Sequence, residues 1–144
     1  MAELRDRIEA EEENIHQVLE RLPVSGKLES LSELELAGTA ALLHSIYGGI
    51  ENILKQALLG SGIRLPTGAS WHRDLLCLAE KHGILQLTTG VSLRPFMAFR
   101  HFFSHAYALE LDPARMEALV RDAEEVVGIV KKDVSAYLQA QTSE

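Results

Sequence analysis

One short segment near residue 100 contains the side chains best suited to chemistry on a nucleotide. Residues 100–107 read RHFFSHAY, so an arginine, two histidines and a tyrosine lie at the end of an apolar, aromatic stretch. A guanidinium can hold phosphate oxygens through paired hydrogen bonds, and an imidazole can move protons near neutral pH. These residue types indicate either a site for a phosphate-containing ligand or an ordinary helix end whose polar side chains are capping or solvated.

The arginine-to-histidine spacing does not select the site by itself. At this composition, an arginine followed by a histidine after four to six residues is expected roughly once by chance. The chain contains two such pairs, Arg100 with His105 and Arg94 with His101. We favour Arg100 with His105, because this pair lies where a helix is predicted to end and Tyr107 follows two residues later. Arg94 with His101 is the rival pair.

The charge of the chain is unevenly distributed. A net charge of −7 argues against a protein that coats nucleic acid through bulk electrostatics. Residues 64–105 nevertheless combine five basic with two acidic side chains, whereas the segments before and after them are acidic. The basic segment also contains four of the six histidines: His72, His82, His101 and His105. We therefore expect an anionic ligand to bind in this segment.

Length and composition predict a single globular domain over residues 1–144. The chain is long enough to bury a core, and no run of about 18 apolar residues suggests a membrane span. The N-terminal residues are too acidic for a signal peptide. The lone Cys77 excludes an intramolecular disulfide and is expected to be a small buried hydrophobe. Together these features favour a cytoplasmic protein.

The hydrophobic periodicity is helical nearly everywhere, and we find no alternating strand pattern with hairpin turns. It predicts an all-α fold, an antiparallel four- or five-helix bundle. The first predicted helix spans about residues 2–22 and the second runs from Ser30 or Ser32 to about residue 59. A third spans 71–82, a fourth follows Gly90, and a fifth begins at Pro113.

Local signals mark the ends of these predicted helices. Ser30 and Glu33 have the spacing of a capping box. Ser70 is suited to cap the third helix, Gly83 to end it, and Asp112 with Pro113 to start the fifth. A proline is tolerated only near the first turn of a helix, so Pro95 is expected there. Phe96, Phe99 and Phe103 share a face and are expected in the core.

Two further features limit the chemistry. Gly48-Gly49 interrupts the second predicted helix at a cost of about 1 kcal/mol per glycine, which indicates close approach of another backbone, a kink or a dimer contact. The pair lacks the lysine and hydroxyl residue of a phosphate-binding loop. His72 and His82 lack the spacing of a helical metal pair, so we expect no metal site.

The segment 100–107 fits the pattern R-x4-H-x-Y, which resembles the signature of HEPN-domain ribonucleases, specifically HepT-type toxins. His101 fits the polar residue that tends to follow the arginine in that family. Residues 46–54, with the sequence IYGGIENIL, resemble the family's long second helix. The order of helices is also similar, and the resemblance covers most of residues 30–140.

The resemblance implies a toxin of a toxin–antitoxin pair that acts as a metal-independent endoribonuclease without a cofactor. It implies a homodimer in which two motifs form one composite site. His105 would be the general base or acid acting on a ribose 2′-hydroxyl, Arg100 would stabilise the transition state, and His101 would support them. Because DNA lacks the 2′-hydroxyl, the substrate would be RNA.

The resemblance also implies a protein partner and a point of control. The partner would be a minimal nucleotidyltransferase antitoxin that attaches AMP to Tyr107, blocking phosphate access by bulk and charge. Without the resemblance, Tyr107 can equally be an ordinary amphipathic tyrosine. Two other functions stay open: a non-catalytic nucleotide- or partner-binding subunit of a nucleotidyltransferase complex, and a helical oligomerisation domain without a site.

Overall fold

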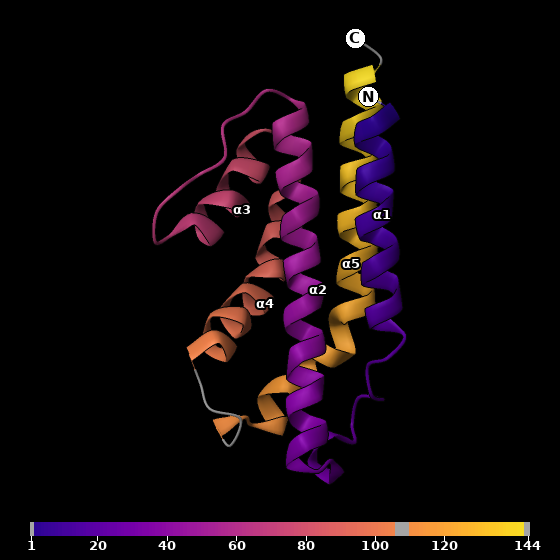
Figure 1. Cartoon of the computed structure of the whole chain (residues 1–144), viewed down its shortest axis with the longest axis vertical. Helices are drawn as coiled ribbons and strands as arrows, with labels where there is room; N and C mark the ends of the chain where they lie inside the picture. Colours follow the sequence, from indigo (N-terminus) through magenta and orange to yellow (C-terminus); the bar gives the residue numbers. More distant parts are fainter. Residues whose placement is uncertain (1, 106–109, 143–144) are drawn as a thin grey trace.

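The computed structural model describes residues 2–105 and 110–142, and in these ranges all regular structure is helical (Figure 1). The elements are α1 (Ala2–Leu19), a 3-10 helix η1 (Leu28–Ser30), α2 (Glu33–Gly60), α3 (Trp71–Lys81), α4 (Leu87–His105) and α5 (Pro113–Thr142). The predicted all-α bundle is confirmed. No helix in the described ranges is long and apolar enough to cross a membrane.

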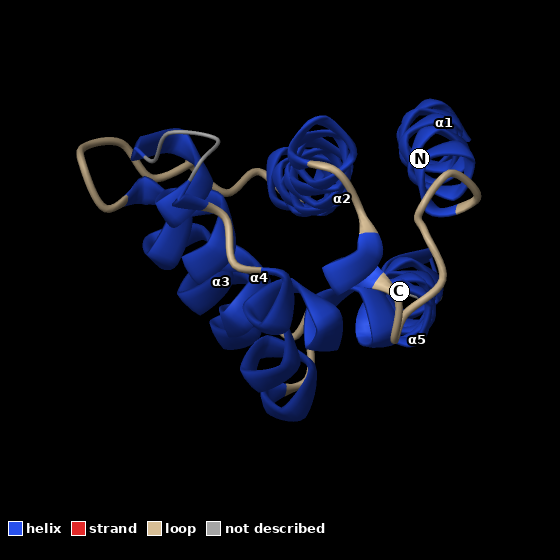
Figure 2. Ribbon diagram, turned by 90° about the horizontal axis from the view of Figure 1, so that it is seen from below, coloured by secondary structure: helices blue, strands red, loops and turns tan. Residues whose placement is uncertain are grey.

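Helix α2 lies at the centre of the bundle. It packs against α1 most extensively, and also against α3, α4 and α5. Seen end-on, α1 and α5 lie to one side of α2, and α3 and α4 lie to the other (Figure 2). Residues 100–105 form the end of α4, and they therefore lie beside α2 and α3.

The core forms along α2, where apolar side chains recur on both of its flanks. Tyr47, Ile50 and Leu54 are fully buried there. Phe96 is buried as predicted, whereas Phe99 and Phe103 are only partly buried and stack at 6.1 Å between ring centroids. Burial of these apolar surfaces is the main favourable contribution to folding.

The capping box of α2 is two residues later than predicted. Ser32 Oγ accepts a hydrogen bond from Glu35 N at 3.1 Å, and Glu35 Oε1 accepts one from Ser32 N at 3.0 Å. Ser30 instead ends η1, and its hydroxyl donates to Lys27 O. The predicted pair of Ser30 with Glu33 was wrong because Ser30 belongs to the short 3-10 helix and Glu33 is already the first residue of α2.

Predicted helix ends elsewhere are mostly confirmed. Gly83 follows α3 with φ of 76°, a left-handed conformation that favours glycine. Asp112 Oδ1 accepts a hydrogen bond from Ala114 N at 3.0 Å, and α5 begins at Pro113. Ser70 precedes α3 as predicted but provides no side-chain cap, since its hydroxyl bonds to the Asp74 carboxylate.

Helix α4 begins earlier than predicted, so Pro95 lies in its interior rather than in its first turn. The cause is a cap supplied by another helix. The buried carboxylate of Asp133 in α5 accepts hydrogen bonds from Gln86 N at 3.0 Å and from the Thr89 hydroxyl at 2.6 Å. Pro95 lies on the exposed side of α4, away from the core. A contact between residues far apart in the sequence therefore sets where the helix starts.

One of the roles left open for the glycine pair is observed, whereas the prediction for the cysteine was wrong. A Cβ atom at Gly49 would lie 2.6 Å from Ile15 Cγ1, so this glycine permits the close approach of α1 to α2. Gly48 meets no such neighbour. Cys77 is exposed, which contradicts its predicted burial, because it lies on the outer side of α3 while Leu75 and Leu76 face the core.

Candidate functional site

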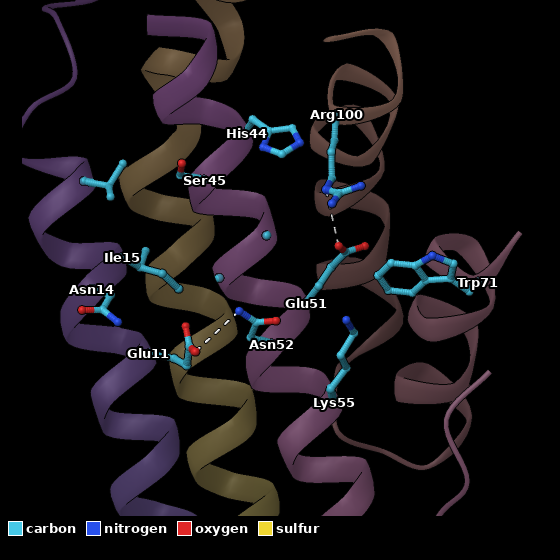
Figure 3. Close-up of a pocket in the computed structure, with 13 residues that line it drawn as sticks. Glu11, Asn14, Ile15, His44, Ser45, Glu51, Asn52, Lys55, Trp71 and Arg100 are labelled. Carbon is cyan, nitrogen blue, oxygen red and sulfur yellow. Dashed lines mark hydrogen bonds and ion pairs between the residues drawn. The ribbon is translucent and has the colours of Figure 1, made fainter. Parts of the chain in front are cut away.

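Arg100 points from α4 towards α2 and α3, where it forms an ion pair with the buried carboxylate of Glu51. Its Nε lies 3.6 Å from Glu51 Oε1 (Figure 3). Its Nη1 lies 3.0 Å from His72 Nε2. The Glu51 side chain is 2% exposed and that of Arg100 is 24% exposed. The arginine is therefore anchored at its inner edge and reaches solvent at its outer edge.

His72 contacts both Glu51 and Arg100. Its Nδ1 lies 2.7 Å from Glu51 Oε2, while its Nε2 faces the arginine. A guanidinium can only donate, so Nε2 must accept and Nδ1 must have the proton that it donates to Glu51. The geometry thus assigns a neutral imidazole to His72, and we name Glu51, His72 and Arg100 the anchor cluster.

Sequence reasoning missed two members of the anchor cluster. His72 was considered as one of the histidines of the basic segment and as half of a metal pair, but not as a partner of Arg100. Glu51 was considered only as part of a family-like helix. One signal was present: after the first turn of α2, Glu51 is its sole acidic residue, and the buried Ile50 and Ile53 lie on either side of it in the sequence. A buried carboxylate needs charged or hydrogen-bonded partners, so such a residue indicates a long-range contact.

Two further groups of α2 surround the anchor cluster. Burial raises the pKa of the Tyr47 phenol far above its usual value, and the Glu51 carboxylate adds to this effect. Burial also lowers the pKa of His44, and the positive charge of Arg100 contributes. The His44 ring packs against Phe103 with centroids 5.5 Å apart. Both groups are therefore uncharged near neutral pH. Since neither gives Arg100 a negative charge, Glu51 is its acidic partner.

His101 and His105 lie on successive turns of α4, with ring centroids 4.8 Å apart, and both are exposed. Together with Arg100 they line a cavity of about 630 Å³ between the start of α3 and the second half of α4, which we name the α3–α4 cavity. The structure therefore brings the predicted Arg100, His101 and His105 to one cavity. Arg100 itself contacts the anchor cluster rather than His105. Tyr107 lies outside the described residues.

The rival arginine has a different environment. Arg94 Nη2 lies 3.0 Å from Glu80 Oε1, an ion pair that joins α4 to α3. Arg94 does not line the α3–α4 cavity, although His101 does. Of the two predicted pairs, only Arg100 with His105 therefore has both members at the α3–α4 cavity.

A second cavity, of about 440 Å³, lies on the α1 side of the anchor cluster and includes Glu11, Asn52, Lys55 and Trp71 (Figure 3). Lys55 Nζ lies 4.2 Å from the centroid of the Trp71 ring. Within the described part of the chain, no group of three or more histidine, cysteine, aspartate or glutamate side chains is arranged to hold a metal ion.

Comparison with known families assigns the chain. A family model described as HepT-like protein matches residues 38–141. The chain belongs to the HepT-like family. This confirms the predicted HepT-type, HEPN-like character. No curated protein and no solved structure matches the chain.

The matched range of this HepT-like protein includes the whole anchor cluster and both histidines that line the α3–α4 cavity. Helix α1 and η1 precede the range. The candidate site therefore lies entirely within the part of the chain that defines the family, and α1 contributes to the fold through its packing on α2.

Proposed function

We propose that this HepT-like protein is the toxin of a toxin–antitoxin pair and a metal-independent endoribonuclease. The observation that best supports the proposal is the placement of Arg100. The buried Glu51 and the partly buried His72 hold its guanidinium at the α3–α4 cavity, which His105 also lines. An anchored cation beside an exposed imidazole suits the cleavage of a phosphodiester.

In the proposed reaction, the His105 imidazole removes the proton of a ribose 2′-hydroxyl. The resulting oxygen attacks the adjacent phosphorus, and the bond from phosphorus to the 5′-oxygen of the next nucleotide breaks. A second imidazole, the same histidine of a second copy, gives its proton to that leaving oxygen. The products are a 2′,3′-cyclic phosphate and a 5′-hydroxyl. Arg100 stabilises the negative oxygens on phosphorus, and His101 supports the pair, with its ring against that of His105 on the next turn of α4.

The deciding experiment incubates the purified protein with single-stranded RNA and with DNA of the same sequence, both in EDTA. We expect cleavage of the RNA alone, with a 2′,3′-cyclic phosphate on the upstream product. Cleavage of the DNA, or a requirement for added divalent cations, would contradict the mechanism, because neither fits attack by a 2′-hydroxyl.

A homodimer is part of the proposal, and an apolar stripe on α4 supports it. Leu87 is 69% exposed and Val91 67% exposed, and Pro95 and Ala98 continue the same exposed face. Their spacing of three to four residues lines them up along the helix, towards His105. We name these four residues the α4 stripe. Pairing two such stripes would bury apolar surface and bring two copies of the motif together.

Replacing Val91 with glutamate tests this interface. We expect the substitution to weaken the dimer by about 2 kcal/mol or more, because each copy would bury an unpaired carboxylate. Size-exclusion chromatography with light scattering should detect monomers, and RNA cleavage should fall with them. The matched control is Val24→Glu, at a side chain that is 71% exposed in the turn after α1. A Val91→Glu protein that remains a fully active dimer would rule out the α4 stripe.

The proposed antitoxin is a minimal nucleotidyltransferase that modifies Tyr107. In that reaction the tyrosine hydroxyl attacks the α-phosphate of ATP and pyrophosphate leaves. After incubation with ATP and a candidate partner, mass spectrometry should find one AMP group on Tyr107, together with a loss of RNA cleavage. Tyr107→Phe should escape both effects. Modification at another residue, or unchanged cleavage after complete modification, would contradict this form of control.

A further inference from the structure

The α3–α4 cavity stands apart from the rest of this acidic protein in its charge. Arg73 and Arg100 line it together with His72, His101 and His105, and none of its described lining residues is acidic. The chain has 21 acidic and 14 basic side chains, so such a wall is unusual for it. By contrast, Glu11 and Glu51 line the cavity on the α1 side. An anion is therefore favoured in the α3–α4 cavity.

Part of the cavity wall is apolar. Trp71, Met97 and Ala98 line it beside the two arginines and the three histidines. The Trp71 ring packs against His72, with ring centroids 3.6 Å apart and the rings tilted by 33°, so its indole is held in place. The volume of about 630 Å³ lies within the usual range for small-molecule sites, about 300–1,000 Å³. A flat base beside an anionic group matches this combination of walls.

The sequence explains why the two walls meet. One side of α4 contributes side chains that are three or four residues apart along the helix: Met97, His101, and then Ser104 and His105. The residues opposite come from the first turn of α3 and the loop before it, which end next to α4.

We propose that the α3–α4 cavity is a nucleotide subsite that binds the base and 3′-phosphate of the RNA residue whose 2′-hydroxyl attacks. This inference rests on the proposed ribonuclease function. It specifies which part of the RNA substrate each protomer binds. Arg100 contacts the phosphate at the inner end, Arg73 contacts it from the rim, and Trp71 with Met97 packs against the base. The ligand class is a nucleoside 3′-monophosphate.

The test uses adenosine 3′-monophosphate, which cannot be cleaved, and the fluorescence of Trp71, the chain's single tryptophan. We expect saturable binding, and at least about fivefold weaker binding of adenosine, which lacks the phosphate. Arg73→Ala should weaken nucleotide binding about fivefold, whereas Lys81→Ala should not, because Lys81 is an exposed cation of α3 outside the cavity.

A pair of substitutions at Ser104 tests the charge of the site without a large change in shape. Ser104 is exposed and lines the cavity. We expect Ser104→Glu to abolish detectable nucleotide binding and Ser104→Gln, of nearly the same size, to retain it. Equal binding by the two variants, or equal affinity for adenosine and its 3′-monophosphate, would overturn the subsite.

Direct binding also separates this inference from the proposed function. Phosphate-dependent binding that Ser104→Glu removes supports the subsite even if RNA is not cut, and then only the ribonuclease assignment fails. RNA cleavage without any saturable binding of the nucleotide leaves the ribonuclease assignment standing and overturns the subsite.

Discussion

Replacing His105 with alanine is expected to reduce the rate of RNA cleavage by about a hundredfold to ten-thousandfold, the usual contribution of a general acid or base. His105 is exposed at the end of α4, so the substitution should leave the fold unchanged. If two copies of this histidine act as base and acid in one composite site, the loss should approach the upper end of that range.

Arg100→Ala is expected to reduce cleavage by about a hundredfold to a thousandfold, because the developing charge on phosphorus loses its preorganised donor. Lysine at this position should restore little, since an ammonium cannot reproduce the planar set of donors that meets both Glu51 and His72. Cleavage rates measured at saturating RNA, with circular dichroism to verify folding, separate these effects from loss of structure.

Two matched controls make this result decisive. His82→Ala removes an exposed histidine outside the α3–α4 cavity, and Arg94→Ala breaks the ion pair with Glu80; neither should change the chemical step. Cleavage that survives both His105→Ala and Arg100→Ala would refute the assignment. Loss of cleavage in Arg94→Ala with intact folding would instead support the rival pair. RNA binding by a protein that never cleaves would favour the non-catalytic subunit.

Replacing Glu51 with alanine is expected to destabilise the protein by about 3 kcal/mol, the lower end of the range for breaking a buried ion pair. The carboxylate is almost fully buried, and its loss leaves the His72 N–H without its acceptor and the Arg100 guanidinium without its ion-pair partner. Both partners retain partial contact with water, which limits the cost. Urea unfolding measures the difference, and Glu124→Ala on the exposed side of α5 is the matched control.

Glu51→Gln distinguishes the charge of this side chain from its hydrogen bond. The amide oxygen can still accept from His72 Nδ1, so we expect a smaller loss of stability than in Glu51→Ala. Cleavage should nevertheless fall, because Arg100 loses the charge that orients it.

This positioning role predicts coupling between the two residues. In an Arg100→Ala background, Glu51→Gln should have no further effect on cleavage, since there is no guanidinium left to orient. Additive effects of the two substitutions on cleavage would contradict a positioning role for Glu51. A Glu51→Ala protein that is as stable as the wild type would contradict the stabilising role of the buried ion pair.

The sequence by itself determined the features that depend on neighbours within a few residues. Helical periodicity predicted all five helices, Gly83 predicted the end of α3, and Asp112 with Pro113 predicted the start of α5. The motif at residues 100–107 also led to the family that the comparison confirms. These signals are local because hydrogen bonds and backbone conformation at a helix end involve only adjacent turns.

Only the tertiary structure decided what Arg100 contacts and where α4 begins. His72 is 28 residues from Arg100 and 21 from Glu51 in the sequence, and Asp133 reaches Gln86 across 47 residues. No spacing rule spans such separations, because the relative orientation of helices depends on how their surfaces pack. The same packing exposed Cys77. The sequence thus located the motif of this protein, and packing around α2 determined that a buried carboxylate holds its arginine at a cavity.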